Sequence, residues 1–188
     1  LHPEDIVIAD DSGVIGLAGV MGGASTEVTD STTRILVESA RFDEVSVART
    51  ARRHKLISES SKRFERGVDP QIQAAAAQRA VELLVELAGA QVEPGVTDVS
   101  LGYEPVVIDL PADSTAGRIG VDYSPEQIES CLREIGCSVE RTESGYAVTV
   151  PSWRTDLRAK EDLTAEIARI EGYENIPSPL PVAPAGPG

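Results

Sequence analysis

The chain has 188 residues, of which 41% are hydrophobic and 26% charged, and its formal net charge is −14. Contacts to phosphates need Lys and Arg, so this acidic balance excludes nucleic-acid binding over the whole surface. No apolar run approaches the ~18 residues of a membrane span, and no basic leader precedes an apolar segment, so we expect a cytoplasmic protein without membrane contact.

The first forty residues predict a β-hairpin followed by a strand that contains a carboxylate. Residues 6–9 and 14–20 are apolar or alternating and flank a polar turn. The run 35–42 is largely apolar around Glu38, which predicts a strand buried on at least one face. A carboxylate in such a strand is paired, hydrogen-bonded or directed at a pocket. Alternatively, Glu38 faces solvent or pairs with an arginine of the basic segment that follows.

That basic segment, residues 49–66, contains seven Lys or Arg against two Glu in an otherwise acidic chain. Its parts 42–54 and 58–67 have helical or turn character. One interpretation is a patch that binds a phosphate-bearing partner. The other is a helix surface with internal pairs, such as Glu59–Arg63 at i,i+4.

A clear helix is predicted from Asp69 to the stop signal Gly89, because apolar residues recur at 3.6-residue spacing. We assign this apolar face to the core. Residues 89–105 are interpreted as a connector with one short strand, and the domain boundary is placed near Gly102.

The second half predicts a strand, a helix, a hairpin and a last helix. Residues 106–110 form the strand. Ser124 is a helix N-cap followed by proline at the first helical position, and the helix ends at Gly136. Residues 138–140 and 146–150 are predicted to pair as antiparallel strands, and residues 160–171 form the last helix.

Two features of the second half concern possible ligands. Cys131 and Cys137 lack the paired spacing of a zinc site, so we interpret them as reduced core thiols. Asp162 and Glu166 lie at i,i+4 on one helix face, with Asp156 just before the helix. Three carboxylates so placed suit a hard cation such as magnesium. Alternatively, they are favoured by the helix dipole and pair as Arg158–Asp162 and Glu166–Arg169.

Several motifs occur along the chain in a fixed order. They are GLAGVMGG (16–23), TEV (26–28), ILVESA (35–40), TARRH (50–54), RFERGVDP (63–70), GC (136–137), VPSWRTDL (150–157), EDL (161–163) and RIEGYENIP (169–177). The motifs up to residue 70 resemble the B3/B4 editing region of the bacterial phenylalanyl-tRNA synthetase beta subunit. The later ones resemble the B5 domain that follows it, and the resemblance covers essentially residues 1–178.

The resemblance implies an α+β fold with two domains. Residues 1–102 would form part of a mixed-sheet B3/B4 tRNA-editing domain, and residues 103–177 a small, winged-helix-like B5 domain. Residues 178–188 are proline-rich and are expected to be a linker or tail. The chain is therefore expected to be a fragment that is inactive alone.

The resemblance also implies that the chain is part of phenylalanine–tRNA ligase. This class II enzyme makes Phe-tRNA with ATP and hydrolyses Tyr-tRNA(Phe). The implied partners are tRNA(Phe), with Arg52 and Arg53 as contact candidates, and the alpha subunit in a heterotetramer of two alpha and two beta subunits. ATP would bind in the complete enzyme and not to this chain. The alternative is a free-standing editing-like or partner-binding module.

For the site residues, the resemblance implies that Glu38 meets the tyrosine hydroxyl and that Gly22 and Gly23 belong to the pocket wall. Glycines let the backbone come close to a substrate. Ser58 and Ser60 occupy positions where the family often has threonine and alanine. Serine in place of alanine narrows the pocket and adds a hydroxyl. No residue of this chain is assigned a catalytic role.

The same resemblance makes Asp156, Asp162 and Glu166 magnesium-associated positions at the contact with the alpha subunit. Where the family pattern has another acid, this chain has Ala165. One ligand fewer predicts weaker magnesium binding, or binding that depends on groups of the alpha subunit.

Overall fold

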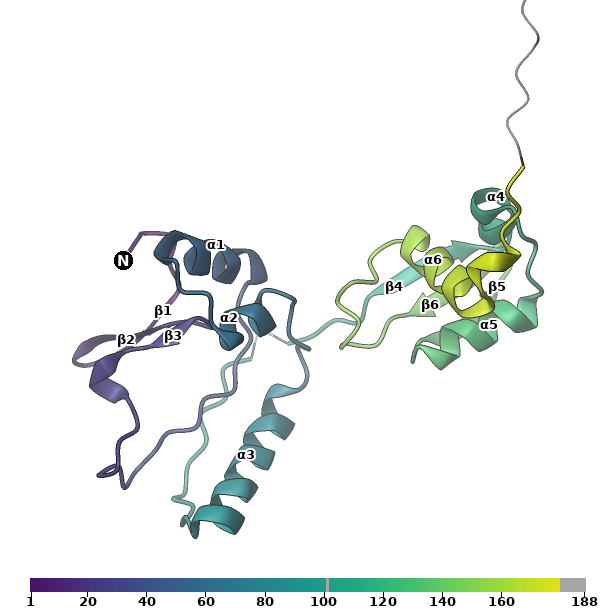
Figure 1. The fold of residues 1–188 in the computed structure, drawn as a ribbon. Helices are drawn as coiled ribbons and strands as arrows, with labels where there is room; N and C mark the ends of the chain where they lie inside the picture. Colours follow the sequence, from purple (N-terminus) through teal and green to yellow (C-terminus); the bar gives the residue numbers. More distant parts are fainter. Residues whose placement is uncertain (101, 180–188) are drawn as a thin grey trace, which may run out of the picture. The chain divides into compact units, whose positions relative to one another are not determined.

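The computed structural model describes residues 1–100 and 102–179, and the chain divides into two compact units, Leu1–Tyr103 and one that begins at Glu104 (Figure 1). Each unit combines helices with a three-stranded sheet, which confirms the α+β prediction. Both sheets are antiparallel, whereas a mixed sheet was expected in the first. Most of the predicted tail, residues 180–188, lies outside the described part. No helix of the described residues is long and apolar enough to cross a membrane.

The sheet of the first unit consists of β1 (Val7–Asp10), β2 (Gly13–Leu17) and the short β3 (Met21–Gly22) in the order β1-β2-β3. The predicted hairpin is thus confirmed. Its turn is closed by the Asp10 side chain, which accepts the backbone N–H of Ser12 at 2.8 Å. Strand β3 was not predicted, because two residues give no alternation to recognise.

Two helices pack against this sheet, α1 (Glu44–His54) and α2 (Glu59–Phe64). The side chain of Asp43 caps α1 by accepting the N–H of Ser46 at 2.7 Å. Helix α1 ends at Lys55, which adopts the left-handed conformation with φ of 56°. The small core joins the sheet to both helices and contains Val20, Val47 and Ala51, flanked by Leu17, Phe42, Leu56 and Phe64.

The strand predicted over residues 35–42 is wrong. The structure has an extended segment there without strand pairing. Leu36 is 98% exposed and Ile35 51% exposed, so the apolar character of this run does not reflect burial within the described residues. Glu38 is also exposed. An apolar run of this length indicates a strand only when a neighbouring strand supplies hydrogen bonds and a cover.

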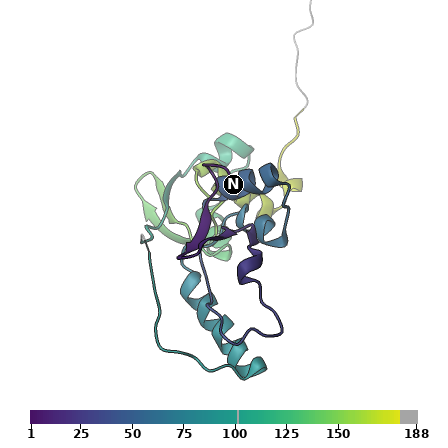
Figure 2. The same cartoon turned by 90° about the vertical axis from the view of Figure 1, so that its left-hand side faces the viewer.

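Helix α3 spans Gln73–Ala88 and ends at Gly89, as predicted, but begins four residues after the predicted start at Asp69. The assignment of its apolar face to the core is wrong, because none of its residues is buried; Leu87, for example, is 77% exposed. Figures 1 and 2 show the chain after α3 turning back along the helix. The described residues of the connector 89–105 contain no strand, contrary to expectation.

The second unit has the sheet order β4-β6-β5, with β4 (Val107–Pro111), β5 (Ser138–Thr142) and β6 (Gly145–Thr149). The hairpin β5–β6 and the strand β4 were predicted from their alternating residues. Gly145 has φ of +154°, and a Cβ there would collide with the backbone oxygen of Leu110. Only glycine therefore fits this turn next to β4.

The helices of the second unit are α4 (Ser114–Ile119), α5 (Pro125–Glu134) and α6 (Lys160–Glu171). Helices α5 and α6 were predicted; α4 was missed because Ser, Thr and Gly favour helix interiors weakly. Short 3-10 turns occur at Ala24–Thr26 in the first unit and at Tyr173–Asn175 in the second. The core lies between the sheet and α5 and α6, with Leu110, Leu132, Val148, Leu163 and Ile167 among its fully buried members.

Both cysteines belong to this core, which confirms the prediction of free, buried thiols. Burial raises the pKa of Cys131 to about 12, and the neighbouring Glu171 carboxylate, which accepts from the thiol at 3.3 Å, adds to the increase. The thiol therefore stays protonated at neutral pH and packs as a small apolar group.

Candidate functional site

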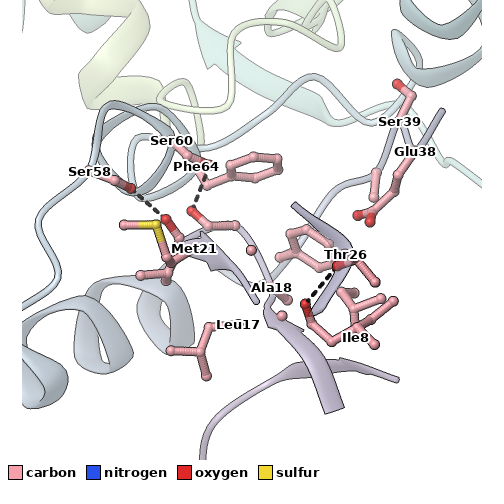
Figure 3. Close-up of a pocket in the computed structure, with 17 residues that line it drawn as sticks. Ile8, Leu17, Ala18, Met21, Thr26, Glu38, Ser39, Ser58, Ser60 and Phe64 are labelled. Atoms are coloured by element: carbon pink, nitrogen blue, oxygen red, sulfur yellow. Dashed lines mark hydrogen bonds between the residues drawn. The ribbon is translucent and has the colours of Figure 1, made fainter. Parts of the chain in front are cut away.

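A pocket of about 680 Å³ opens in the first unit between the β2–β3 turn, the extended segment 38–42 and helix α2 (Figure 3). It brings together four of the five residues predicted for a binding pocket, Gly22, Glu38, Ser58 and Ser60. These residues come from three separate parts of the sequence. A pocket of this volume is larger than an amino-acid side chain and can therefore accommodate one.

Gly23, the fifth predicted pocket residue, does not line the pocket. Its N–H donates to the backbone oxygen of Ile15 at 2.7 Å, and a Cβ on Gly23 would come within 2.7 Å of the same oxygen. Gly23 is thus required for the close approach of two backbone segments. A Cβ on Gly22, in contrast, would meet nothing within 4 Å, so this glycine leaves open space at the pocket wall.

The apolar wall of the pocket was not predicted. Phe42 and Phe64 lie with their ring centroids 5.2 Å apart, in a tilted arrangement. Leu17 and Met21 line the pocket as well. The sequence offered one signal, since one phenylalanine precedes the basic segment and the other lies within it, but their separation by 22 positions gave no periodic pattern.

Glu38 supplies the one carboxylate among the pocket-lining residues. Figure 3 shows the Glu38 carboxylate and the Ser39 hydroxyl pointing in opposite directions, as expected for consecutive residues of an extended segment. In the part of the chain that the structure describes, Glu38 has neither a hydrogen-bond nor an ion-pair partner. The alternative pairing with a basic-segment arginine is therefore wrong, and the carboxylate is available as an acceptor.

Of the two arginines predicted to contact tRNA, one is engaged within the chain and the other is not. Arg53 binds Asp5, with 2.5 Å between Nη1 and Oδ1, and also binds Glu4 at 2.5 Å. Arg52 is exposed, and none of the described residues pairs with its guanidinium. The expected Glu59–Arg63 pair is replaced by Glu59–Lys62 at 2.7 Å. Of the two predicted tRNA contacts, Arg52 and Arg53, only Arg52 thus has a guanidinium that is free within the described residues.

Asp5 is the centre of the cluster that engages Arg53. Its fully buried side chain also accepts from Thr50 at 3.1 Å, from His54 Nε2 at 2.6 Å and from the N–H of His2 at 2.7 Å. Burial alone would raise the pKa of Asp5, but hydrogen bonds from His54, His2, Thr50 and Arg53 together hold this pKa well below its usual range. The cluster fastens the chain before β1 to the end of α1.

In the second unit, two of the three predicted metal ligands bind an arginine. Both oxygens of Asp156 accept from Arg154, at 2.9 and 2.7 Å, and Glu166 accepts from Arg154 at 3.1 Å. Arg169 also binds Glu166, at 2.8 Å, as the predicted i,i+3 pair. The Arg154 hydrogen bond lowers the pKa of Asp156, and the Arg169 hydrogen bond is the main cause of the lowered pKa of Glu166.

Asp162, the third predicted ligand, accepts the backbone N–H groups of Arg158 and Ala159, each at 2.9 Å. It therefore satisfies donors at the start of α6. Within residues 1–100 and 102–179, no group of three or more His, Cys, Asp or Glu is gathered closely enough to hold a metal. These carboxylates do not fit a magnesium ion, which needs free oxygen ligands.

Comparisons with known proteins agree with the division of the chain into two units. Residues 1–89 match the family described as the B3/4 domain, and residues 108–173 match the tRNA synthetase B5 domain. The chain thus contains a B3/4 domain followed by a domain of the tRNA synthetase B5 class.

The similarity extends over the whole chain. The beta subunits of phenylalanine–tRNA ligase from Streptomyces avermitilis and Leifsonia xyli subsp. xyli are each 55% identical to it, and that from Thermobifida fusca is 54% identical. All three alignments include 100% of this chain and 22–23% of the relative. The chain is therefore similar over its whole length to phenylalanine–tRNA ligase beta subunits and spans less than a quarter of the length of these relatives.

Proposed function

We propose that this chain is a segment of a phenylalanine–tRNA ligase beta subunit and that its pocket takes part in the hydrolytic editing of Tyr-tRNA(Phe). One observation carries the proposal: a single pocket collects Gly22, Glu38, Ser58 and Ser60 from distant parts of the sequence and leaves the carboxylate unpaired. The continuous similarity through both domains supports a synthetase component over a free-standing module.

The chemistry of this pocket suits a phenol. The tilted pair Phe42 and Phe64 offers apolar surface to an aromatic ring, and Glu38 offers an acceptor to the hydroxyl proton. Phenylalanine has the same ring but would leave the carboxylate without a partner. A site built around a substrate hydroxyl rejects the analogue that lacks it, because a polar group of the site then stays unpaired.

Hydrolysis would break the ester bond between the tyrosyl carbonyl carbon and the ribose oxygen, with water adding to that carbon. We assign the recognition of the amino-acid side chain to this chain, and no catalytic group. Aminoacylation with ATP and magnesium belongs to the complete enzyme, and no step is assigned to a metal held by Asp156, Asp162 and Glu166.

The proposed partners follow from the family. We propose an alpha subunit, in an assembly of two alpha and two beta subunits, and tRNA(Phe), with Arg52 rather than Arg53 contacting a phosphate. A cytoplasmic location follows from the same proposal, since aminoacylated tRNA is used there.

The test replaces Glu38 by alanine in the complete enzyme. We expect the rate of Tyr-tRNA(Phe) hydrolysis to fall by about tenfold or more, because a hydrogen bond to a charged acceptor contributes about 1.5–3 kcal/mol. Charging with phenylalanine should stay unchanged, since it occurs at another site. The measurement is deacylation of purified Tyr-tRNA(Phe) together with a phenylalanine charging assay.

Glu86→Ala is the matched control, because Glu86 is an exposed carboxylate on α3 away from the pocket lining. It should leave both reactions unchanged. Unchanged hydrolysis of Tyr-tRNA(Phe) by the Glu38→Ala enzyme would show that this pocket does not recognise tyrosine.

A further inference from the structure

The hydroxyl of Ser58 has two structural partners. Its oxygen accepts the N–H of Ser61 at 2.9 Å, which caps helix α2, and its proton is donated to the backbone oxygen of Val20 at 2.6 Å. Val20 is only 2% exposed, so this carbonyl belongs to a buried part of the chain. A single oxygen thus joins the start of α2 to the turn between β2 and β3.

Ser60 makes a second connection to the same turn. Its hydroxyl donates to the backbone oxygen of Gly19 at 3.0 Å, directly beside the carbonyl that Ser58 binds. Figure 3 shows both hydrogen bonds on the side of the pocket away from Glu38. The first turn of α2 therefore holds two consecutive carbonyls of the glycine-rich turn.

The turn has little freedom on its other side. Gly19 has φ of +68°, and a Cβ there would lie only 3.1–3.2 Å from Phe64, Val47 and Phe42. The backbone of Gly19 therefore rests directly on the aromatic pair. A small shift of this turn moves the apolar wall of the pocket, because close-packed groups transmit displacements.

We propose that Ser58, assisted by Ser60, is a positioning residue of the pocket that fixes this wall at a set distance from Glu38. The inference rests on the proposed editing function and adds to it which residues set the selectivity for a hydroxyl. Ser58 acts through the Val20 carbonyl and not by contact with substrate.

The same hydrogen bonds determine which donors the pocket offers. A serine hydroxyl has one proton, and both serines use theirs on backbone carbonyls. Neither serine has a proton left for Glu38, so the extra hydroxyl at position 60 does not occupy the acceptor. The pocket therefore selects a ligand that brings its own donor, such as the phenol of tyrosine.

The test compares Ser58→Thr with Ser58→Val in the complete enzyme. These side chains have nearly the same shape, but only threonine can cap α2 and donate to Val20. The measured quantity is the ratio of kcat/KM for hydrolysis of Tyr-tRNA(Phe) to that for Phe-tRNA(Phe). A loss of folded enzyme lowers both values equally and leaves the ratio unchanged, so the ratio reports the pocket geometry alone.

We expect Ser58→Val to lower this ratio by about tenfold, the effect of roughly one hydrogen bond. Ser58→Thr should keep it within about twofold of the parent. Ser60→Ala, at an exposed position where folding is not at risk, should lower the ratio by about two- to threefold. The control is Ser130→Ala, an exposed helical serine of the second unit, which should change nothing.

Equal ratios for Ser58→Val and Ser58→Thr would overturn the proposal, and so would an unchanged ratio in both Ser58→Val and Ser60→Ala. Glu38→Ala is measured in parallel to separate the two hypotheses. If Glu38→Ala abolishes the preference for Tyr-tRNA(Phe) while Ser58→Val keeps it, only the positioning role fails. If Glu38→Ala also keeps the preference, the proposed editing function fails.

Discussion

The two units of this chain bury their apolar side chains to different extents. The second unit encloses thirteen buried residues in one cluster, whereas the corresponding cluster of the first unit has three. The carboxylates predicted as ligands or acceptors also differ between the units: Arg154 neutralises Asp156 and Glu166 in the second unit, while Glu38 has no partner in the described part of the first. Carboxylates that pair with a neighbouring arginine stabilise their own unit, and an unpaired acceptor in a pocket is available to a ligand.

We expect the largest effect in a test of the difference in core size between the two units. The test compares two Leu→Ala substitutions, one in a helix of each unit. Leu163 in α6 is fully buried, and its replacement should lower the free energy of unfolding by about 3 kcal/mol. Leu87 in α3 is 77% exposed, and its replacement should cost less than about 0.5 kcal/mol. The measurement is urea unfolding followed by far-UV circular dichroism and by the fluorescence of Trp153, the single tryptophan.

Similar costs for the two substitutions would contradict this comparison. Trp153 lies in the second unit, where it packs against Gly136, so its fluorescence reports that unit separately. A loss at Leu87 comparable to that at Leu163 would mean that α3 is packed in solution.

The next effect concerns Arg154, whose side chain is 20% exposed. Arg154→Ala leaves Asp156 and the largely buried Glu166 without this partner and should lower the unfolding free energy of the second unit by about 1–2 kcal/mol. Adding Asp156→Asn to this variant should recover part of the loss, because Asp156 pairs with Arg154 alone whereas Glu166 keeps its pair with Arg169. Trp153 fluorescence during urea unfolding measures both variants.

Magnesium provides the control for this interpretation. If Asp156, Asp162 and Glu166 formed a metal site in place of the arginine pairs, about 5 mM magnesium would stabilise the parent chain beyond an ionic-strength-matched sodium control. We expect no such difference.

A smaller effect is predicted for the pH dependence of the first unit. The pKa of Asp5 is lowered in the folded state, so its contribution to stability is complete above the unfolded value of about 3.9 and is lost as the pH falls below it. Asp5→Asn should lower the melting temperature by several degrees at pH 7 and flatten its decline between about pH 4 and 2. Melting curves across this range are the measurement; parallel curves for parent and variant would exclude Asp5 as the titrating group.

The smallest effect distinguishes the two neighbouring arginines. Arg52→Ala should reduce the slope of log affinity for tRNA(Phe) against log salt concentration by about one in the complete enzyme, as for the loss of one phosphate contact. Arg53→Ala should mainly lower the melting temperature, because Arg53 is bound to Asp5 and Glu4. Equal salt slopes for the Arg52→Ala enzyme and the parent would identify Arg52 as a surface residue without a tRNA contact.

Elements with strong local signals were predictable from the sequence. The Ser124 cap with Pro125, the stop at Gly89 and the hairpin β5–β6 each depend on residues a few positions apart. Burial was not predictable in this way. The apolar periodicity of α3 and the apolar run at Leu36 indicate surfaces suited to burial, but the described residues provide no cover for them.

The candidate pocket was predicted in part. The glycine-rich turn, Glu38 and the two serines were singled out by resemblance to a family, while the wall of Phe42 and Phe64 depends on how α2 docks. The pairing of Arg154 with two of the predicted metal ligands was not foreseen, for a similar reason. Asp162 and Glu166 do lie on α6 at the predicted spacing. Arg154, however, bridges Glu166 on this helix and Asp156 in the loop before it, and this tertiary contact cannot be deduced from residue spacing.

The pocket uses only the first third of the chain. The seventeen described residues that line it fall between Ile8 and Phe64, and none of them belongs to α3. Because proteins are synthesised from the amino terminus and domains tend to fold as they emerge, the ribosome delivers these seventeen residues before α3 or the second unit is made. A translation pause after residue 64 would thus present a nascent chain that already contains these seventeen pocket residues.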